Sequence, residues 1–319
     1  MNQEPKSTLS TPSSPFGKFL DREYCLMVRG LGMLAIVYGH TINEFMPFLE
    51  KYHLTMTLGL APLGTAICFF LSGFGLTMSF AHNNVDKSYI YRHLRGLFLP
   101  YLIFWLLWVA VGCVLGTFPS EQNLLLSFLT LAMPNADAWF FKSIVVIYIV
   151  YMLLRRFFRG YERISITILI LCYVSILAYF QMPAHLWARM LCFPLGIMFA
   201  SYSSLRKPIS LMGTGMLFLL TMATIVLGDN FILLTPLFLM LFLAYASPRI
   251  RIRLSILSWI GANSIYVYLM EAIPMDYMNS QEVGILVFVL GGIGITLILS
   301  HVGRWIERFI NRKVFNYSV

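Results

Sequence analysis

The sequence predicts an all-α polytopic membrane protein with about ten transmembrane helices, and three observations lead to this fold class. The chain of 319 residues is 59% hydrophobic and only 12% charged, whereas charged residues make up about a quarter of a soluble domain. Its apolar runs approach the roughly 20 residues that a helix needs to cross a bilayer core of about 30 Å. Its basic residues gather in alternate loops. Only short loops remain, which excludes a large soluble domain.

The apolar runs divide the chain into three predicted parts. The first, 1–21, begins with residues rich in Ser, Thr and Pro and is expected to be a disordered cytosolic segment. A transmembrane domain over 22–303 follows, and then a basic cytosolic tail over 304–319. The loop 117–137 contains LLLSFLTLAM, which is too short to span and predicts a re-entrant or interfacial helix over the outer face. The ten predicted spans are 27–48, 57–81, 96–116, 138–154, 164–182, 184–202, 209–227, 231–247, 255–274 and 283–303.

The basic residues orient these spans. An even number of spans places both termini on one side of the membrane, and 20 of the 23 Lys and Arg residues fall on that side. Only Lys51 lies in an opposite loop. Because basic loops face the cytoplasm, both termini are predicted to be cytosolic in a protein integral to the cytoplasmic membrane. The net charge of +9 is then explained by membrane topology, without nucleic acid as a partner.

The cysteines show no pattern typical of a metal centre or a disulfide framework. They lie in or beside apolar runs, without Cys-x-x-Cys or Cys/His spacing. We therefore expect buried thiols, with neither disulfides nor a bound metal. The five residues are Cys25, Cys68, Cys113, Cys172 and Cys192.

Five ionisable side chains fall inside predicted spans, where a charge is costly and therefore points to function. His40 follows Arg29 by 11 residues, which places it about 16 Å further from the cytosol, near the middle of the bilayer. Glu44 lies one turn beyond His40 on the same helix face. The topology puts the three remaining residues at the level of His40 or closer to the outer surface, so it predicts a mixed-charge pocket that opens outward. These three residues are Lys142, Arg189 and Glu271.

A second basic cluster lies at the predicted cytosolic mouth of the third span. Arg92 and Arg95 are three residues apart on one helical face, with His93 between them in sequence. Guanidinium groups bind phosphate oxygens in a bidentate manner, so this pair suits a phosphate-bearing cytosolic ligand. Arg29 is expected nearby.

Each of these residues also has a structural interpretation. Arg92 and Arg95 suit contacts with lipid headgroups. A neutral His40 suits a hydrogen bond to a backbone carbonyl of a neighbouring helix. Lys142 suits an ion pair with Glu271 or Glu44 that joins two helices. These alternatives stay open at the level of the sequence.

Six segments in order resemble the acyltransferase-3 family of integral membrane acyltransferases, over about residues 22–303. The resemblance includes a first helix with Arg29 and His40, an FF-x-x-SGF segment, the Arg-x-x-Arg motif followed by Pro-Tyr, and a Trp-Phe-x-Lys helix that begins at Trp139. The six strings are VRGLGMLAIVYGH, CFFLSGFGL, YRHLRGLFLPYL, WFFKSIVVIYIVY, RMLCFPLGIMFA and WIGANSIYVYLM. The chain departs from the family pattern at Glu271, where the motif often ends in His, and at Ala138, where His often precedes the Trp.

The resemblance implies transfer of an acyl group, usually acetyl, from cytosolic acyl-CoA to a hydroxyl of an extracytoplasmic glycan or lipid-linked sugar. It implies that His40 is catalytic and that Arg92 and Arg95 bind the acetyl-CoA donor, supported by Arg29. The outer set is then expected to position the acceptor. This set contains Trp139, Lys142, Arg189 and Glu271.

The layout of the residues agrees with this chemistry. A hydroxyl is a poor nucleophile at neutral pH, so attack on a thioester needs a base such as His40, oriented by Glu44 or Glu271. The phosphates of CoA cannot enter hydrocarbon, but its elongated arm can carry the acyl group up to His40. A transporter or exporter of glycans or metabolites is the alternative, because titratable groups along a central polar pathway also serve proton-coupled transport.

Overall fold

The computed structural model describes residues 19–44, 60–116, 128–129, 131, 139–182, 187–207, 209–226, 234–250, 252–279 and 284–314. Every regular element in these ranges is a helix, which confirms the all-α prediction for them. Residues 1–18 of the segment expected to be disordered, 1–21, lie outside the described residues. The expected interfacial helix at 117–137 also lies outside them, except for residues 128, 129 and 131.

The helices follow one another in the order that the apolar runs predict, with two regions divided into shorter pieces. They are α1 (Arg22–Glu44), α3 (Leu60–His82), α4 (Lys87–Leu115), α6 (Trp139–Phe157), α7 (Glu162–Tyr179), η3 (Ala188–Leu191), α8 (Cys192–Ser201), η4 (Ser203–Arg206), α9 (Leu211–Val226), α10 (Leu234–Ala246), α11 (Ser255–Ala262), α12 (Ser264–Met270), α13 (Ala272–Asn279) and α14 (Ile285–Val314).

The described helices include several that can cross a membrane. Four are long and apolar enough to do so alone, namely Leu60–His82, Lys87–Leu115, Glu162–Tyr179 and Val289–Lys313. A fifth candidate is the pair Ser255–Ala262 and Ser264–Met275, whose halves are bent by 73°. Shorter apolar helices cover Ala188–Ser201, Leu211–Ile225 and Leu234–Ala246. The chain is therefore a multi-pass membrane protein, while the number ten and the cytosolic side of the termini stay predictions.

Three predicted spans differ from the helices that form. The third helix begins at Lys87, nine residues before the predicted 96–116, because Asp86 caps it by accepting a hydrogen bond from the Tyr89 amide at 2.7 Å. The last helix continues to Val314 through a stretch in which about half of the residues are charged, so much of the predicted tail 304–319 is helical. The predicted span 255–274 is three short helices, α11, α12 and α13.

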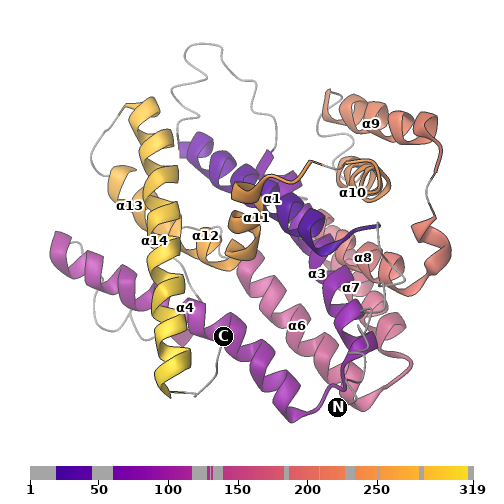
Figure 1. The fold of residues 1–319 in the computed structure, drawn as a ribbon, viewed down its shortest axis with the longest axis horizontal. Coiled ribbons are helices and arrows are strands. Elements are labelled where there is room, and N and C mark those ends of the chain that lie inside the picture. The colour runs from indigo at the N-terminus through magenta and orange to yellow at the C-terminus, as the bar shows by residue number, and fades with distance from the viewer. Residues whose placement is uncertain are drawn as a thin grey trace, which may run out of the picture.

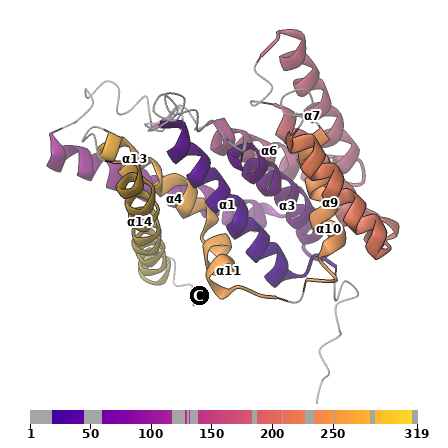
Figure 2. The same cartoon turned by 90° about the horizontal axis from the view of Figure 1, so that it is seen from above.

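The helix α3 lies at the centre of the bundle. In its most apolar stretch, 72% of the residues are buried, whereas the corresponding share is 22% in α4 and in α7. Figures 1 and 2 show α1 and α3 in the middle, with α13 and α14 on one side and α9 and α10 on the other. The residues on α1 and α3 are therefore the ones that neighbouring helices can surround.

Glycines allow α1 to approach α11 closely. A Cβ atom added at Gly30 would collide with the backbone oxygen of Leu257, and one added at Gly261 would collide with that of Leu26. The same close approach joins α3 to α8, since a Cβ at Gly73 would meet the backbone of Phe193. Small residues at such crossings let membrane helices gain packing contacts that lipid cannot supply.

The cysteines are all free thiols, but they are not all buried. Cys68 and Cys192 are buried, as expected, whereas Cys25 is only half-buried. The expectation is wrong for Cys113 and Cys172, which are exposed on α4 and α7. Both helices have the length and apolar character of membrane spans, so these side chains lie on faces that suit lipid.

Candidate active site

The centre of the candidate site is a pair formed by His40 and Glu271. Nδ1 of His40, on α1, lies 2.8 Å from Oε1 of Glu271, although the two residues are 231 positions apart in sequence. The side chain of Glu271 is 2% exposed and that of His40 is 12% exposed. The pair is thus largely shielded from solvent, where the electrostatic part of a hydrogen bond is stronger than in water.

A break in the chain after α11 places Glu271 at this position. The segments on either side of Asn263 are bent by 73°, and the Asn263 side chain donates a 2.7 Å hydrogen bond to the Trp259 carbonyl. The same carbonyl accepts from the backbone amide of Asn263 at 3.1 Å, so Asn263 is bound to the last turn of α11 through both its backbone and its side chain. After the bend, α12 packs against α1, α4 and α14. Glu271 follows directly at the joint between α12 and α13.

The pairing determines which nitrogen of His40 can act as a base. A carboxylate acceptor beside Nδ1 keeps the proton of a neutral imidazole on Nδ1, so the lone pair is on Nε2. When Nε2 takes up a proton, the neighbouring carboxylate stabilises the imidazolium that forms. The alternative of a His40 that only bonds to a backbone carbonyl therefore does not account for the arrangement at Nδ1.

An aromatic layer lies next to this pair. Tyr268, one turn before Glu271, has its ring centroid 5.1 Å from that of Phe140 in an edge-on arrangement. Phe140 contacts Phe69 of α3 in the same way at 5.1 Å, and Trp139 lies 6.3 Å from Phe69. The layer joins α12, α6 and α3. It therefore connects Trp139, a predicted site residue, to α12, which directly precedes Glu271.

The other predicted outer residues have different surroundings. Lys142 is half-buried on α6, and among the described residues no ion pair joins it to Glu271, which pairs with His40 instead. The ion pair between Lys142 and Glu271 that the sequence allowed is thus not formed. Arg189 is buried, at 5% exposure, on η3, which packs against α3, α7 and α8. Glu44 is the last residue of α1, and its side chain lies outside the described part of the structure.

A cavity of about 570 Å³ lies between α1 and α3 at their predicted cytosolic ends. Its cationic and titratable lining includes Arg22 and Arg29 of α1 and His82 of α3, over apolar side chains such as Phe74 and Met78. The combination suits a ligand with a phosphorylated end and an apolar arm. The sequence pointed to Arg29 but not to Arg22 or His82, because both look like ordinary residues at a span end.

Arg92 and Arg95 lie on the next helix and are not among the residues that line this cavity. Arg92 is exposed and Arg95 is half-buried. The start of α4 is attached to α3, because the Tyr89 hydroxyl donates to Oγ of Ser79 at 2.7 Å. The two arginines therefore follow a helix start that is held against α3.

A buried apolar stripe joins the cavity to His40. Arg29 and His40 are 11 residues apart, which is close to three helical turns, so they share a face of α1 at a rise of about 16 Å. Met33, Ile36 and Val37 lie between them and are at most 3% exposed. A ligand arm that extends from Arg29 to His40 must displace or pass these side chains.

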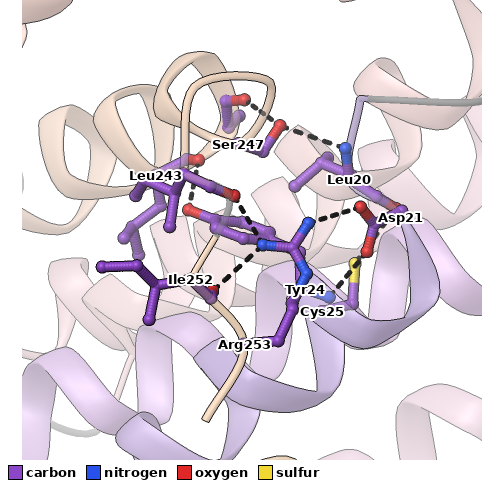
Figure 3. Close-up of polar contacts among 10 residues, drawn as sticks. Leu20, Asp21, Tyr24, Cys25, Leu243, Ser247, Ile252 and Arg253 are labelled. Atoms are coloured by element: carbon purple, nitrogen blue, oxygen red, sulfur yellow. Dashed lines mark hydrogen bonds and ion pairs between the residues drawn. The ribbon is translucent and has the colours of Figure 1, made fainter.

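Contacts with the segment between α10 and α11 hold the predicted cytosolic end of α1 (Figure 3). Nη2 of Arg253 lies 2.6 Å from Oδ2 of Asp21, and its guanidinium lies 5.7 Å from the centre of the Tyr24 ring. The Tyr24 hydroxyl donates to the carbonyl of Leu243 at 2.8 Å. The backbone amide of Leu20 donates to Oγ of Ser247 at 3.1 Å. Since Leu20 and Asp21 line the cavity, these bonds determine where one of its walls stands.

Comparison with known proteins adds one match. The model of the acyltransferase-3 family, described as an acyltransferase domain, matches residues 24–305. The match includes His40, Glu271 and the arginines at 29, 92 and 95. No curated protein and no solved structure matches the chain.

Proposed function

Because the chain belongs to the acyltransferase-3 family and is a multi-pass membrane acyltransferase, we propose that it transfers an acetyl group from cytosolic acetyl-CoA to a hydroxyl of an extracytoplasmic glycan or lipid-linked sugar. The observation that carries this proposal is the 2.8 Å contact between Nδ1 of His40 and the Glu271 carboxylate. It supplies an oriented base at the level where a donor from inside and an acceptor from outside can meet.

The reaction follows from this pair. Nε2 of His40 takes the proton from the acceptor hydroxyl as its oxygen attacks the thioester carbonyl. The new bond joins that oxygen to the acyl carbon, the carbon–sulfur bond breaks, and the proton passes from His40 to the CoA thiolate. Glu271 stabilises the imidazolium between these two proton transfers. The same nitrogen is the nucleophile if the acyl group passes through His40 in a two-step reaction.

The cavity between α1 and α3 supports a donor site. The phosphates of CoA stay at the cytosolic surface, where Arg22, Arg29 and His82 line the cavity and where the α4 pair Arg92 and Arg95 extends the positive surface. The pantetheine arm then follows the stripe toward His40. Met33 is an unbranched side chain in that stripe, and such a side chain can change rotamer to admit the arm.

The acceptor site is proposed on the outer side of the pair. Trp139 belongs to the aromatic layer next to Glu271, and its half-buried neighbour Lys142 follows one turn later on α6. Aromatic faces and cations suit the apolar and the hydroxyl-rich or anionic parts of a sugar. Arg189 completes this set in our proposal. Glu271 is assigned to the positioning of His40, because its carboxylate contacts the imidazole.

The experiment measures label transfer across membrane vesicles. Radiolabelled acetyl-CoA is supplied on the cytosolic side, and label is counted in the glycan and lipid-linked sugar fraction of the opposite side. His40→Ala is expected to reduce the rate by about 10²–10⁴-fold, while affinity for CoA and the melting temperature in detergent are unchanged. His53→Ala, in a predicted loop, and His185→Ala, at the end of a predicted span, are matched controls. Near wild-type label transfer by His40→Ala, with proton-coupled glycan export retained, would favour the transporter instead.

A further inference from the structure

A second cluster of titratable and aromatic side chains lies away from the proposed reaction, where α11 meets α14. A small cavity of about 40 Å³ is enclosed there by Trp259, Asn263, His301, Arg304, Trp305 and Arg308. The ring of Trp259 stacks on that of His301 at a centroid distance of 6.1 Å. The cavity thus has aromatic walls and, besides them and Asn263, three basic side chains that can donate hydrogen bonds.

The charges around the cavity are unequal. One carboxylate, Glu307, accepts from Nη1 of Arg304 at 3.2 Å and from the Tyr266 hydroxyl at 3.2 Å. Nε of Arg304 is buried and has no hydrogen-bond partner among the described residues. Arg308 is exposed and forms no ion pair within that part of the chain. The cluster therefore contains two guanidinium groups and an imidazole but one carboxylate, which already accepts two hydrogen bonds. Because donors outnumber acceptors, the site suits an oxyanion.

The position of the cavity on α14 indicates where the oxyanion comes from. The cavity residues of α14 run from the middle of the candidate span Val289–Lys313, at His301, to Arg308 in its last part, which is followed by Arg312 and Lys313. The lateral surface beside them is apolar, with Trp305 63% and Phe309 53% exposed. Trp residues and basic residues together mark the interface between hydrocarbon and water. The predicted topology places this interface in the cytoplasmic leaflet, which carries the anionic lipids.

We propose that this corner binds the phosphate of an anionic phospholipid of the cytoplasmic leaflet. Arg304, Arg308 and His301 donate to the phosphate oxygens, and the acyl chains lie along the exposed apolar face of α14. At about 40 Å³ the cavity can admit a group of the size of a water molecule or a phosphate oxygen, but it is far too small for a nucleotide, so the acyl donor does not fit here. Basic pockets between membrane helices on the cytoplasmic side are typical sites for anionic headgroups.

This site is connected to the His40–Glu271 pair through the bend. Asn263 lines the cavity and is also the residue at which α11 and α12 separate. Tyr266, on α12, is held by Glu307, which Arg304 also holds. Glu271 follows Tyr266 by five residues. A phosphate bound by Arg304 is therefore expected to stabilise the bend that positions Glu271, although lipid binding itself does not depend on the proposed reaction.

Native mass spectrometry of the full chain in detergent tests the proposal directly. The probes are dioleoylphosphatidylglycerol and the zwitterionic dioleoylphosphatidylcholine, each added at the same molar excess. The wild type is expected to retain one phosphatidylglycerol more strongly than phosphatidylcholine. Since each basic residue near an anionic lipid contributes about a fivefold gain in binding, Arg308→Gln combined with His301→Gln should remove about fivefold or more of this preference. Arg312→Gln, on the same helix end but outside the cavity, is the control and should keep it.

The double variant leaves the Arg304–Glu307 pair intact, and its melting temperature without lipid reports whether it folds. A second measurement needs no variant: phosphatidylglycerol with brominated chains should quench tryptophan fluorescence more than brominated phosphatidylcholine. Equal retention and equal quenching of the two lipids would overturn the proposal. So would an equal loss of preference in Arg312→Gln, which would indicate general surface charge. Stabilisation by inorganic phosphate alone, without preference between the lipids, would identify a free phosphate site and overturn the lipid assignment.

Discussion

The carboxylate of Glu271 lies 2.8 Å from Nδ1 of His40, although Glu271 stands 231 residues further along the chain and follows the bend at Asn263. His40 itself stands on an unbroken helix, α1. A charged group that follows the bend of a broken span, facing a titratable group on an intact helix, is an arrangement that membrane proteins use at functional sites. Here it gives the base a fixed orientation, and the following predictions depend on it.

Glu271→Gln should reduce acyl transfer at least about tenfold, because the amide keeps the size of the side chain but removes the negative charge that stabilises the imidazolium. Affinity for CoA should stay the same, since the donor head binds elsewhere. Initial rates at saturating acetyl-CoA measure the effect. Glu44→Gln is the control, and a larger loss in that variant than in Glu271→Gln would assign the orienting role to Glu44.

Arg29→Gln and Arg22→Gln should each weaken CoA binding by about tenfold or more, because each removes a charge-assisted hydrogen bond to phosphate. Binding of CoA to the purified protein, measured by isothermal titration at constant salt, tests this. Arg156→Gln, an exposed arginine at the end of α6, is the control. Unchanged affinity in the double variant at 22 and 29 would mean that the donor does not use the cavity.

Arg92→Ala and Arg95→Ala should also weaken CoA binding, by about tenfold for each charged hydrogen bond lost. Their effect should be larger at low salt than at high salt, because Arg92 is exposed and exposed charges are screened. The same titration at two ionic strengths checks this. If the pair instead contacts lipid headgroups, affinity for CoA will not change in the double variant.

Met33→Phe should slow transfer while CoA binding is retained, because a rigid ring in the buried stripe obstructs the arm between Arg29 and His40. Overpacking of a buried site typically costs 1–3 kcal/mol, so the melting temperature must be measured together with the rate. Leu31→Phe is the matched control, since Leu31 is on the same helix and 49% exposed. Equal rates in the two variants would contradict a path along this stripe.

Gly261→Ala should destabilise the protein by about 1–3 kcal/mol, because a Cβ at this position collides with the Leu26 backbone where α1 and α11 cross. Gly292→Ala on α14 is the control, since no atom of the described residues lies within 4 Å of its added Cβ. That change should be neutral or raise stability by up to about 1 kcal/mol through helix propensity. Thermal unfolding in detergent compares the two, and equal melting temperatures would show that the crossing tolerates a wider separation.

The sequence by itself determined the fold class, the family and most of the residues discussed above. Apolar runs and basic loops are local properties, so the helices around α3 and α4 could be predicted within a few residues, except for the start of α4 and the end of α14. The position of His40 relative to Arg29 followed from helical periodicity alone. The motifs with Arg92, Arg95 and Trp139 are contiguous strings, and they can be recognised without a structure.

Only the tertiary structure showed that Glu271 contacts His40. Helical periodicity places Glu44 one turn from His40, whereas the contact of Glu271 depends on a 73° bend far along the chain. Whether the helix bends at Asn263 depends on how its hydrogen bonds compare in energy with packing against α1, α4 and α14, and no local sequence pattern predicts that difference. The same reason applies to Arg22 and His82. They are ordinary residues at helix ends until the packing of α1 against α3 encloses a cavity between them.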